Sequence, residues 1–168
     1  MTDQAEVRVG ILTVSDGVVA GTRDDVSGAR IEQWSVEQGF TIACRELVAD
    51  GTVGVSSVLR AWADTEVCDV IITTGGTGLT ERDLTPEATR SVIVREAPGI
   101  SEQIRAVGRE STSHAALGRG ISGVRNRTLN VNLPGSPAGV ADGLDVLTPI
   151  VRHAAALLRG TASHDTPE

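Results

Sequence analysis

The sequence contains no lysine and no tyrosine, and only one phenylalanine and two tryptophans in 168 residues. All 15 basic residues are therefore arginines. Without lysine the chain cannot have a Walker A lysine, a Schiff-base nucleophile or the lysine that anchors pyridoxal phosphate. Any bound phosphate must be held by backbone N–H groups, hydroxyls, arginine or a metal ion. The scarcity of aromatic rings also argues against a stacking platform for single-stranded nucleic acid.

Positive charge and long apolar runs are scarce as well. The 22 acidic residues outnumber the 15 basic ones and give a formal net charge of −7, which disfavours binding to a nucleic-acid backbone. No stretch approaches the ~18 apolar residues of a membrane span, and residues 1–6 do not resemble a secretion signal. Cys44 and Cys68 form no C-x-x-C motif and are expected to be buried thiols in a reducing compartment. We therefore expect a cytoplasmic protein that binds neither nucleic acid nor a membrane.

Apolar runs and glycines divide the chain into alternating strands and helices. Strands are expected at residues 7–14, 41–48 and 67–73, and a strand pair at 121–132 with its turn near Asn126 and Arg127. Helices are expected at residues 28–38, closed by Gly39, and around the apolar stripe at 55–62. A third helix should run from an N-cap at Thr85 to about Arg95, and a fourth should contain Ile100, Ile104 and Val107. The segment after LPGSP should be helical as far as Arg159. This order predicts one α/β domain over residues 1–160, with a three-layer, mostly parallel, doubly wound sheet, followed by a disordered polar tail at 161–168.

Three glycine-containing polar loops follow expected strands, so they should meet at the edge of the sheet where ligands bind. They are Ser15-Asp16-Gly17, Thr74-Gly75-Gly76-Thr77-Gly78 and Pro134-Gly135-Ser136. Glycines allow consecutive N–H groups to surround an anion, and threonine hydroxyls add donors. The second loop is a weak dinucleotide fingerprint, because Glu81 occupies the third glycine position. Ser136 precedes Pro137 as a helix N-cap does, and such a serine can also contact a phosphate.

Carboxylates accompany these loops. Asp50 follows the second strand, and Asp83 lies just after the glycine-rich loop. Each is either a turn-forming aspartate or a ligand for Mg²⁺, which takes one or two carboxylates together with phosphate oxygens. The first loop is also acidic, through Asp16, Asp24 and Asp25. Because this many carboxylates repel a triphosphate, they favour a divalent ion between them.

The segments VSDGVVAGTRDDVSG, TTGGTGLTERDLTPEAT and NLPGSP together resemble the molybdopterin adenylyltransferase family of molybdenum-cofactor biosynthesis, over roughly residues 7–159. The resemblance implies a mixed-sheet, molybdopterin-binding-like fold and a homotrimer, or a hexamer as in some members. It also implies Mg²⁺-dependent transfer of AMP from ATP to the phosphate of molybdopterin, with release of pyrophosphate. A downstream molybdenum-insertion protein is the partner that this pathway implies.

Carried over by position, the resemblance implies that Asp50 and Asp83 are the essential aspartates that hold Mg²⁺. Ser136 matches a serine linked with turnover and product release. The nucleotide and pterin-phosphate loops, with their neighbours, match Ser15, Asp16, Gly17, Thr74, Gly75, Gly76, Thr77, Gly78, Pro134 and Gly135. The alternative is a carrier or scaffold protein that binds pterin or nucleotide without catalysis. The aspartates beside the glycine loops favour the enzyme, because a carrier needs no metal.

Overall fold

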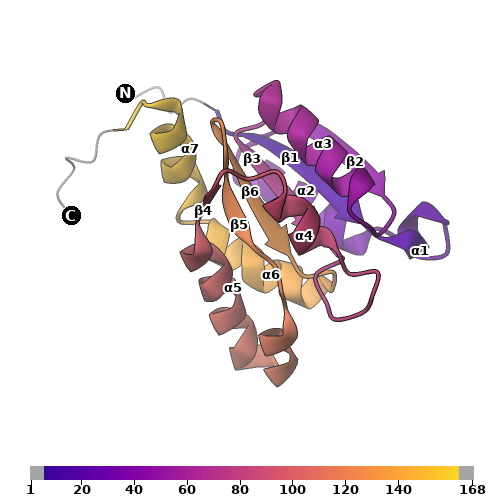
Figure 1. Cartoon of the computed structure of the whole chain (residues 1–168). Helices are drawn as coiled ribbons and strands as arrows, with labels where there is room; N and C mark the ends of the chain where they lie inside the picture. Colours follow the sequence, from indigo (N-terminus) through magenta and orange to yellow (C-terminus); the bar gives the residue numbers. More distant parts are fainter. Residues whose placement is uncertain (1–5, 163–168) are drawn as a thin grey trace.

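The computed structural model describes residues 6–162, in which strands and helices alternate (Figure 1). The strands are β1 (Arg8–Val14), β2 (Thr41–Val48), β3 (Val70–Thr74), β4 (Arg95–Glu96), β5 (Ser122–Arg125) and β6 (Thr128–Leu133). The helices are α1 (Asp16–Val19), α2 (Val26–Glu37), α3 (Val53–Asp64), α4 (Thr85–Arg90), α5 (Pro98–Ser111), the 3-10 helix η1 (Ser113–Leu117), α6 (Pro137–Leu147) and α7 (Val151–Arg159). Of the expected tail at 161–168, residues 163–168 lie outside the described part. The amides of Thr161 and Ala162 both donate to the carbonyl of Ala156 at the end of α7.

The strands form one sheet in the order β2-β1-β3-β6-β5-β4. Strands β2, β1, β3 and β6 are parallel, whereas β5 and β4 are each antiparallel to the preceding strand in this order. Helices α2, α5, α6 and α7 contribute to the apolar core on one face, and α3 and α4 to the core on the other. The expected three-layer α/β fold with a mostly parallel, mixed sheet is therefore confirmed.

Both predicted limits of the helix between Thr85 and Arg95 are wrong. Helix α4 has only six residues, Thr85 lies inside it rather than at its N-cap, and no side chain caps it. The helix ends early because the next residues join the sheet: the amide of Val94 donates to Val124, and Arg95 pairs with the same residue. Pairing with β5, which makes residues 95–96 the edge strand of the sheet, outweighs the local preference for a helix. Pro98 is the first residue of the next helix, α5.

Other local predictions are confirmed. Asn126 has a φ of +51° in the two-residue turn between β5 and β6, a conformation that asparagine tolerates. Gly39 follows α2 with a φ of +68°. At the start of α6, Ser136 accepts a hydrogen bond from the amide of Gly139, and Pro137 is the first helical residue.

The two cysteines differ in their surroundings. Both are free thiols, but only Cys68 is fully buried, whereas Cys44 is half-buried. Burial is the main cause that raises the pKa of the Cys68 thiol to about 12, and the neighbouring Cys44 raises it further. The thiol of Cys68 therefore stays protonated at neutral pH.

Three loops meet at Gly75, beyond the ends of β1, β3 and β6. Gly75 has a φ of +98°, and a Cβ atom built on it would lie 2.1 Å from the carbonyl oxygen of Val14. A Cβ on Gly135 would lie 3.3 Å from the Cα of Gly75. In the sheet, β2 lies next to β1 on one side, whereas β6, β5 and β4 lie beyond β3 on the other side. The chain therefore leaves β1 and β3 in opposite directions, and the loops after these two strands diverge. Gly75 therefore occupies the switch point of the sheet, where ligands bind in such folds.

At the opposite end of the sheet, the 2% exposed Asp69 joins both termini of the described chain to β3. It accepts hydrogen bonds from the backbone N–H of Arg8 (2.8 Å), from Arg8 Nε (3.1 Å) and from Arg159 Nε (2.9 Å). Burial alone would raise the pKa of Asp69, but the hydrogen bonds from Arg8 and Arg159 outweigh it and lower the pKa. Asp69 is thus charged in the folded protein and fastens α7 to β1 and β3.

We predict that Asp69→Asn lowers the free energy of unfolding by about 2–4 kcal/mol, because it removes a buried charge that accepts several charge-assisted hydrogen bonds. The pKa of Asp69 is lower in the folded than in the unfolded state, so its contribution is complete above the unfolded pKa. It is lost as the pH falls below about 4. Urea denaturation at several pH values measures both effects. Asp64→Asn is the control, because Asp64 is an exposed carboxylate paired with Arg125, and its loss should leave stability nearly unchanged.

We also predict that Gly75→Ala destabilises the protein by about 2–5 kcal/mol, because the new Cβ meets backbone atoms and the φ angle is strained. Gly54 is the matched control: it lies in α3, and a Cβ there would only be in ordinary contact with the side chain of Val48, at 3.7 Å. Gly54→Ala should leave stability unchanged or slightly raised. Thermal melts of both variants measure the difference, and equal melting temperatures would contradict the packing argument.

Candidate functional site

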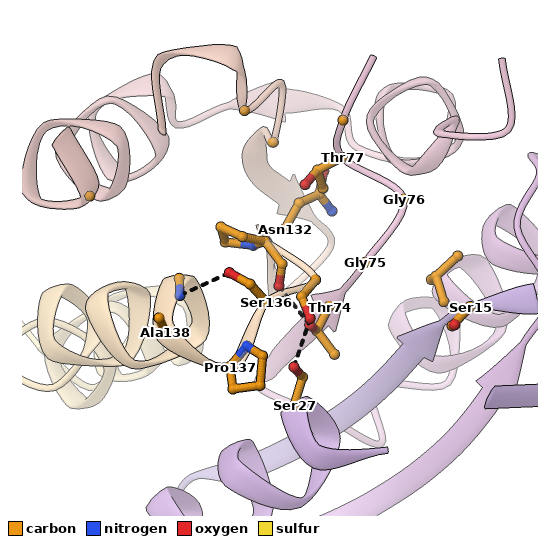
Figure 2. A pocket seen from close by; sticks show the side chains of 18 of the residues that line it. Ser15, Ser27, Thr74, Gly75, Gly76, Thr77, Asn132, Ser136, Pro137 and Ala138 are labelled. Atoms are coloured by element: carbon orange, nitrogen blue, oxygen red, sulfur yellow. Dashed lines mark hydrogen bonds between the residues drawn. The ribbon is translucent and has the colours of Figure 1, made fainter. Parts of the chain in front are cut away.

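A cavity of about 740 Å³ lies beyond the carboxyl ends of β1, β3 and β6 and continues between α5, η1 and α6 (Figure 2). It gathers most of the candidate residues from the sequence: Ser15, Asp50, Thr74, Gly75, Gly76, Thr77, Gly78, Asp83, Pro134, Gly135 and Ser136 all line it. Asp16 and Gly17 do not line it. The three loops expected at one edge of the sheet therefore do share one site.

Hydroxyl groups fasten the loop after β6 in place. Thr74 donates from Oγ1 to the carbonyl of Pro134 (2.7 Å), and Ser27 at the start of α2 donates from Oγ to the carbonyl of Gly135 (2.8 Å; Figure 2). In a trans peptide the N–H lies opposite the carbonyl, so the amides of Gly135 and Ser136 point away from these hydroxyls. The loop thereby has the ordered backbone that close contact with a phosphate requires.

Helices α2 and α6 both begin at the cavity. Asp25 caps α2 by accepting from the amide of Gly28, and Ser136 caps α6 through the amide of Gly139 at 3.1 Å. Helix N-termini carry partial positive charge and favour anions. Since the Ser136 oxygen accepts the capping bond, its O–H remains a donor for a ligand. The predicted double role of Ser136, as a cap and a phosphate contact, is compatible with this geometry.

Asp16 and Asp50 bind each other reciprocally, the backbone amide of each donating to the carboxylate of the other. The amide of Asp16 donates to Asp50 Oδ2 (2.8 Å), and the amide of Asp50 donates to Asp16 Oδ1 (3.0 Å). Arg82 holds the pair from outside, through both oxygens of Asp16 and the carbonyl of Asp50 (2.7 Å). The hydrogen bond from Arg82 lowers the pKa of Asp16. In this structure Asp16 positions Asp50 from beside the cavity, and the predicted contact of Asp16 with nucleotide stays a prediction.

The oxygen atoms around Gly76 and Gly78 suit a hard cation. A Cβ on Gly76 would lie 3.2 Å from Asp50 Oδ1 and 2.2 Å from Thr85 Oγ1, and one on Gly78 would lie 2.8 Å from Asp83 Oδ2. The Thr85 hydroxyl is buried and has no hydrogen-bond partner in the described residues. Carboxylate and hydroxyl oxygens are the ligands that Mg²⁺ prefers. Because glycines keep both carboxylates accessible, the residues present fit this ion.

Within residues 6–162, no three His, Cys, Asp or Glu side chains come together as ligands of one metal ion. Two carboxylates are nevertheless enough for Mg²⁺, which commonly takes its remaining ligands from water and substrate phosphates. A cation here would therefore bind together with a phosphate ligand. The predicted metal role of Asp50 and Asp83 stays a prediction.

Ser27 and Asn132 line the cavity but were not among the sequence candidates. Asn132, near the end of β6, is 2% exposed and donates from Nδ2 to the hydroxyls of Thr73 and Thr89, each at 2.9 Å. It thereby joins the β3 end, which carries the glycine loop, to α4. The signal that could have found it is a polar side chain inside the apolar strand TLNVNL.

None of the helices in the described part of the chain is long and apolar enough to cross a membrane.

The sequence matches the family described as "Probable molybdopterin binding domain" over residues 10–153. A solved structure named as the molybdopterin biosynthesis enzyme MoaB from Thermus thermophilus is 49% identical, with a TM-score of 0.86. The alignment covers 92% of this chain and 97% of that one.

Two curated relatives show how this chain compares in length. A protein named molybdopterin adenylyltransferase from Helicobacter pylori is 33% identical, over 92% of this chain and 89% of the relative. A molybdenum cofactor biosynthesis bifunctional protein from Synechococcus elongatus is 38% identical, and the match covers 96% of this chain but 50% of the relative. This chain thus spans about half the length of that bifunctional relative. With matches over most of its length in both sequence and fold, the chain belongs to the probable molybdopterin binding domain family.

Proposed function

We propose that this chain is a molybdopterin adenylyltransferase, which transfers AMP from ATP to the phosphate of molybdopterin and releases pyrophosphate with the help of Mg²⁺. The observation that carries the proposal is the cavity that joins two aspartates, three glycine-containing loops and the N-termini of two helices. Relatives named molybdopterin adenylyltransferase, matched over most of the chain, support the same activity.

The residues of the cavity have distinct tasks in this reaction. Backbone N–H groups of the glycine loops orient the phosphates, and Asp50 and Asp83 hold the metal ion. When bound, Mg²⁺ supplies positive charge that neutralises the α-phosphate and the leaving pyrophosphate. Ser136 donates its O–H to the substrate phosphate at the start of α6. The attacking phosphate monoester is already an anion, so the reaction needs no strong general base. The lack of lysine and tyrosine is compatible with this chemistry.

The direct test is to incubate the protein with molybdopterin, ATP and Mg²⁺ and to measure adenylylated molybdopterin and pyrophosphate. Formation of both products is the expected result. Binding of molybdopterin or ATP without either product would instead support the alternative, a carrier or scaffold protein with the same fold.

We predict that Asp83→Asn and Asp50→Asn each reduce the rate of AMP transfer roughly a hundred- to several-thousand-fold, equivalent to about 3–5 kcal/mol. Asparagine keeps the acceptor oxygen that Asp83 uses for Thr80 and that Asp50 uses for Asp16, so both variants should fold normally. Both residues act on one ion, so the double variant should be little slower than either single variant. Rate assays and thermal melts of all three variants measure this.

Asp64→Asn serves as the control, because it neutralises a carboxylate that does not line the cavity. It should keep the wild-type rate. Near-wild-type rates in Asp83→Asn would exclude this residue as a metal ligand, and loss of activity that accompanies unfolding would make its role structural.

We also propose that the chain forms a homotrimer, with a hexamer as the larger alternative. The surface between α5 and α6 has a hollow of about 520 Å³ lined mostly by apolar residues, among them Ile100, Val107, Val146 and Ile150, together with Gln103 and Asp145. A closed assembly would bury such a surface. Sedimentation velocity should give three times the chain mass of 17.5 kDa. A monomer at every concentration would contradict the proposal. A molybdenum-insertion protein as partner and a cytoplasmic location stay predictions.

A further inference from the structure

Arg119, in the segment between η1 and β5, contacts the turn that carries Asp83. Its backbone N–H donates to the carbonyl of Thr77 (2.9 Å), and its Nε donates to the carbonyl of Gly78 (2.8 Å). Its Nη2 donates to the carbonyl of Asp83. One guanidinium group thus binds both ends of residues 78–83, the turn between the glycine loop and α4.

Glu87, in the first turn of α4, orients the guanidinium. Nη1 of Arg119 donates to one carboxylate oxygen, and Nη2 donates to the other at 3.3 Å. The hydrogen bonds from Arg119 lower the pKa of Glu87, so its carboxylate is charged at neutral pH. A planar guanidinium held at two points has a fixed direction, which a lysine ammonium group lacks.

The turn has its own internal bonds. Asp83 Oδ2 accepts from both the amide and the hydroxyl of Thr80, each at 2.8 Å, and the amide of Asp83 donates to the carbonyl of Thr80 at 3.1 Å. These bonds set the shape of the turn. The contacts with Arg119, together with the bond from the amide of Thr85 to the carbonyl of Gly76, set its place beside the cavity.

We propose that Arg119 is a positioning residue that holds Asp83 where its carboxylate binds Mg²⁺ with the substrate phosphates; this inference rests on the proposed function. Arg119 does not line the cavity, although Gly118 and Gly120 on either side of it do. It therefore acts through the turn rather than on a substrate. The carbonyls of Gly78 and Asp83 belong to half-buried residues that water can reach, so loss of Arg119 should loosen the turn rather than unfold the protein.

The experiment compares Arg119→Gln and Arg119→Lys with Arg125→Gln. Arg125 is a matched control, since it binds both oxygens of Asp64 (2.7 and 3.0 Å) and the carbonyl of Val92 (3.1 Å) away from the cavity. Arg119→Gln should raise the Mg²⁺ concentration for half-maximal AMP transfer at least about tenfold, with a smaller effect on kcat at saturating Mg²⁺. Its melting temperature should fall no more than that of Arg125→Gln. Arg119→Lys should recover only part of the loss.

Two further measurements separate positioning from a general structural role. Amide hydrogen exchange in residues 78–83 of the free protein should accelerate in Arg119→Gln but not in Arg125→Gln. Adding Arg119→Gln to Asp83→Asn should slow the enzyme no further, because both changes affect the same ligand. Wild-type Mg²⁺ dependence in Arg119→Gln, unchanged exchange in the turn, or multiplied losses in the double variant would each overturn the proposal.

Failure of the proposed function would look different. The wild type would then form no adenylylated molybdopterin at any Mg²⁺ concentration. Calorimetric titration with Mg²⁺ and a non-hydrolysable ATP analogue still measures the positioning effect in that case. Arg119→Gln should weaken this binding at least about tenfold, and equal affinities in wild type and variant would overturn the inference.

Discussion

The site depends on one steric constraint, the close approach of three loops at a residue without a side chain. At Gly75 the backbone after β3 passes so near to Val14 and Gly135 that a Cβ has no space. Because β1 and β3 are parallel neighbours whose chains leave in opposite directions, their ends open a crevice at this point. The cavity, the start of α6 and the aspartates after β2 and β3 are all arranged around that crevice.

Arginine has a mainly structural role around this crevice. Arg82 binds Asp16, Arg119 binds Glu87, and at the far end of the sheet Arg8 and Arg159 bind Asp69. The first two also donate to backbone carbonyls of the loops, which a planar group with several donors does well. Two other arginines, Arg23 and Arg105, line the cavity itself. In the proposed function, a chain with a net charge of −7 would hold phosphates through helix N-termini, backbone N–H groups and the proposed divalent ion.

Local signals predicted most of the architecture. The turn at Asn126, the cap at Ser136 and the end of α2 at Gly39 follow from residues adjacent in sequence. The wrong limits of α4 have a non-local cause, because the pairing of Arg95 with Val124 depends on a strand almost thirty residues later. The partners of Asp16 are also non-local: the family resemblance implies that Asp16 contacts nucleotide, which stays a prediction, and its bonds with Asp50 and Arg82 join segments far apart in the sequence.

The sequence by itself determined the α/β alternation, the three glycine loops and the two aspartates that follow strands, because short-range propensity and motif spacing carry this information. Only the tertiary structure decided that Gly75 is the meeting point of the loops and that Asp16 lies beside the cavity rather than in it. The tertiary structure alone also revealed that Asn132 and Arg119 brace the elements carrying the glycine loop and Asp83. These facts depend on contacts between residues up to about sixty positions apart, and no local pattern records which distant backbone a side chain will reach.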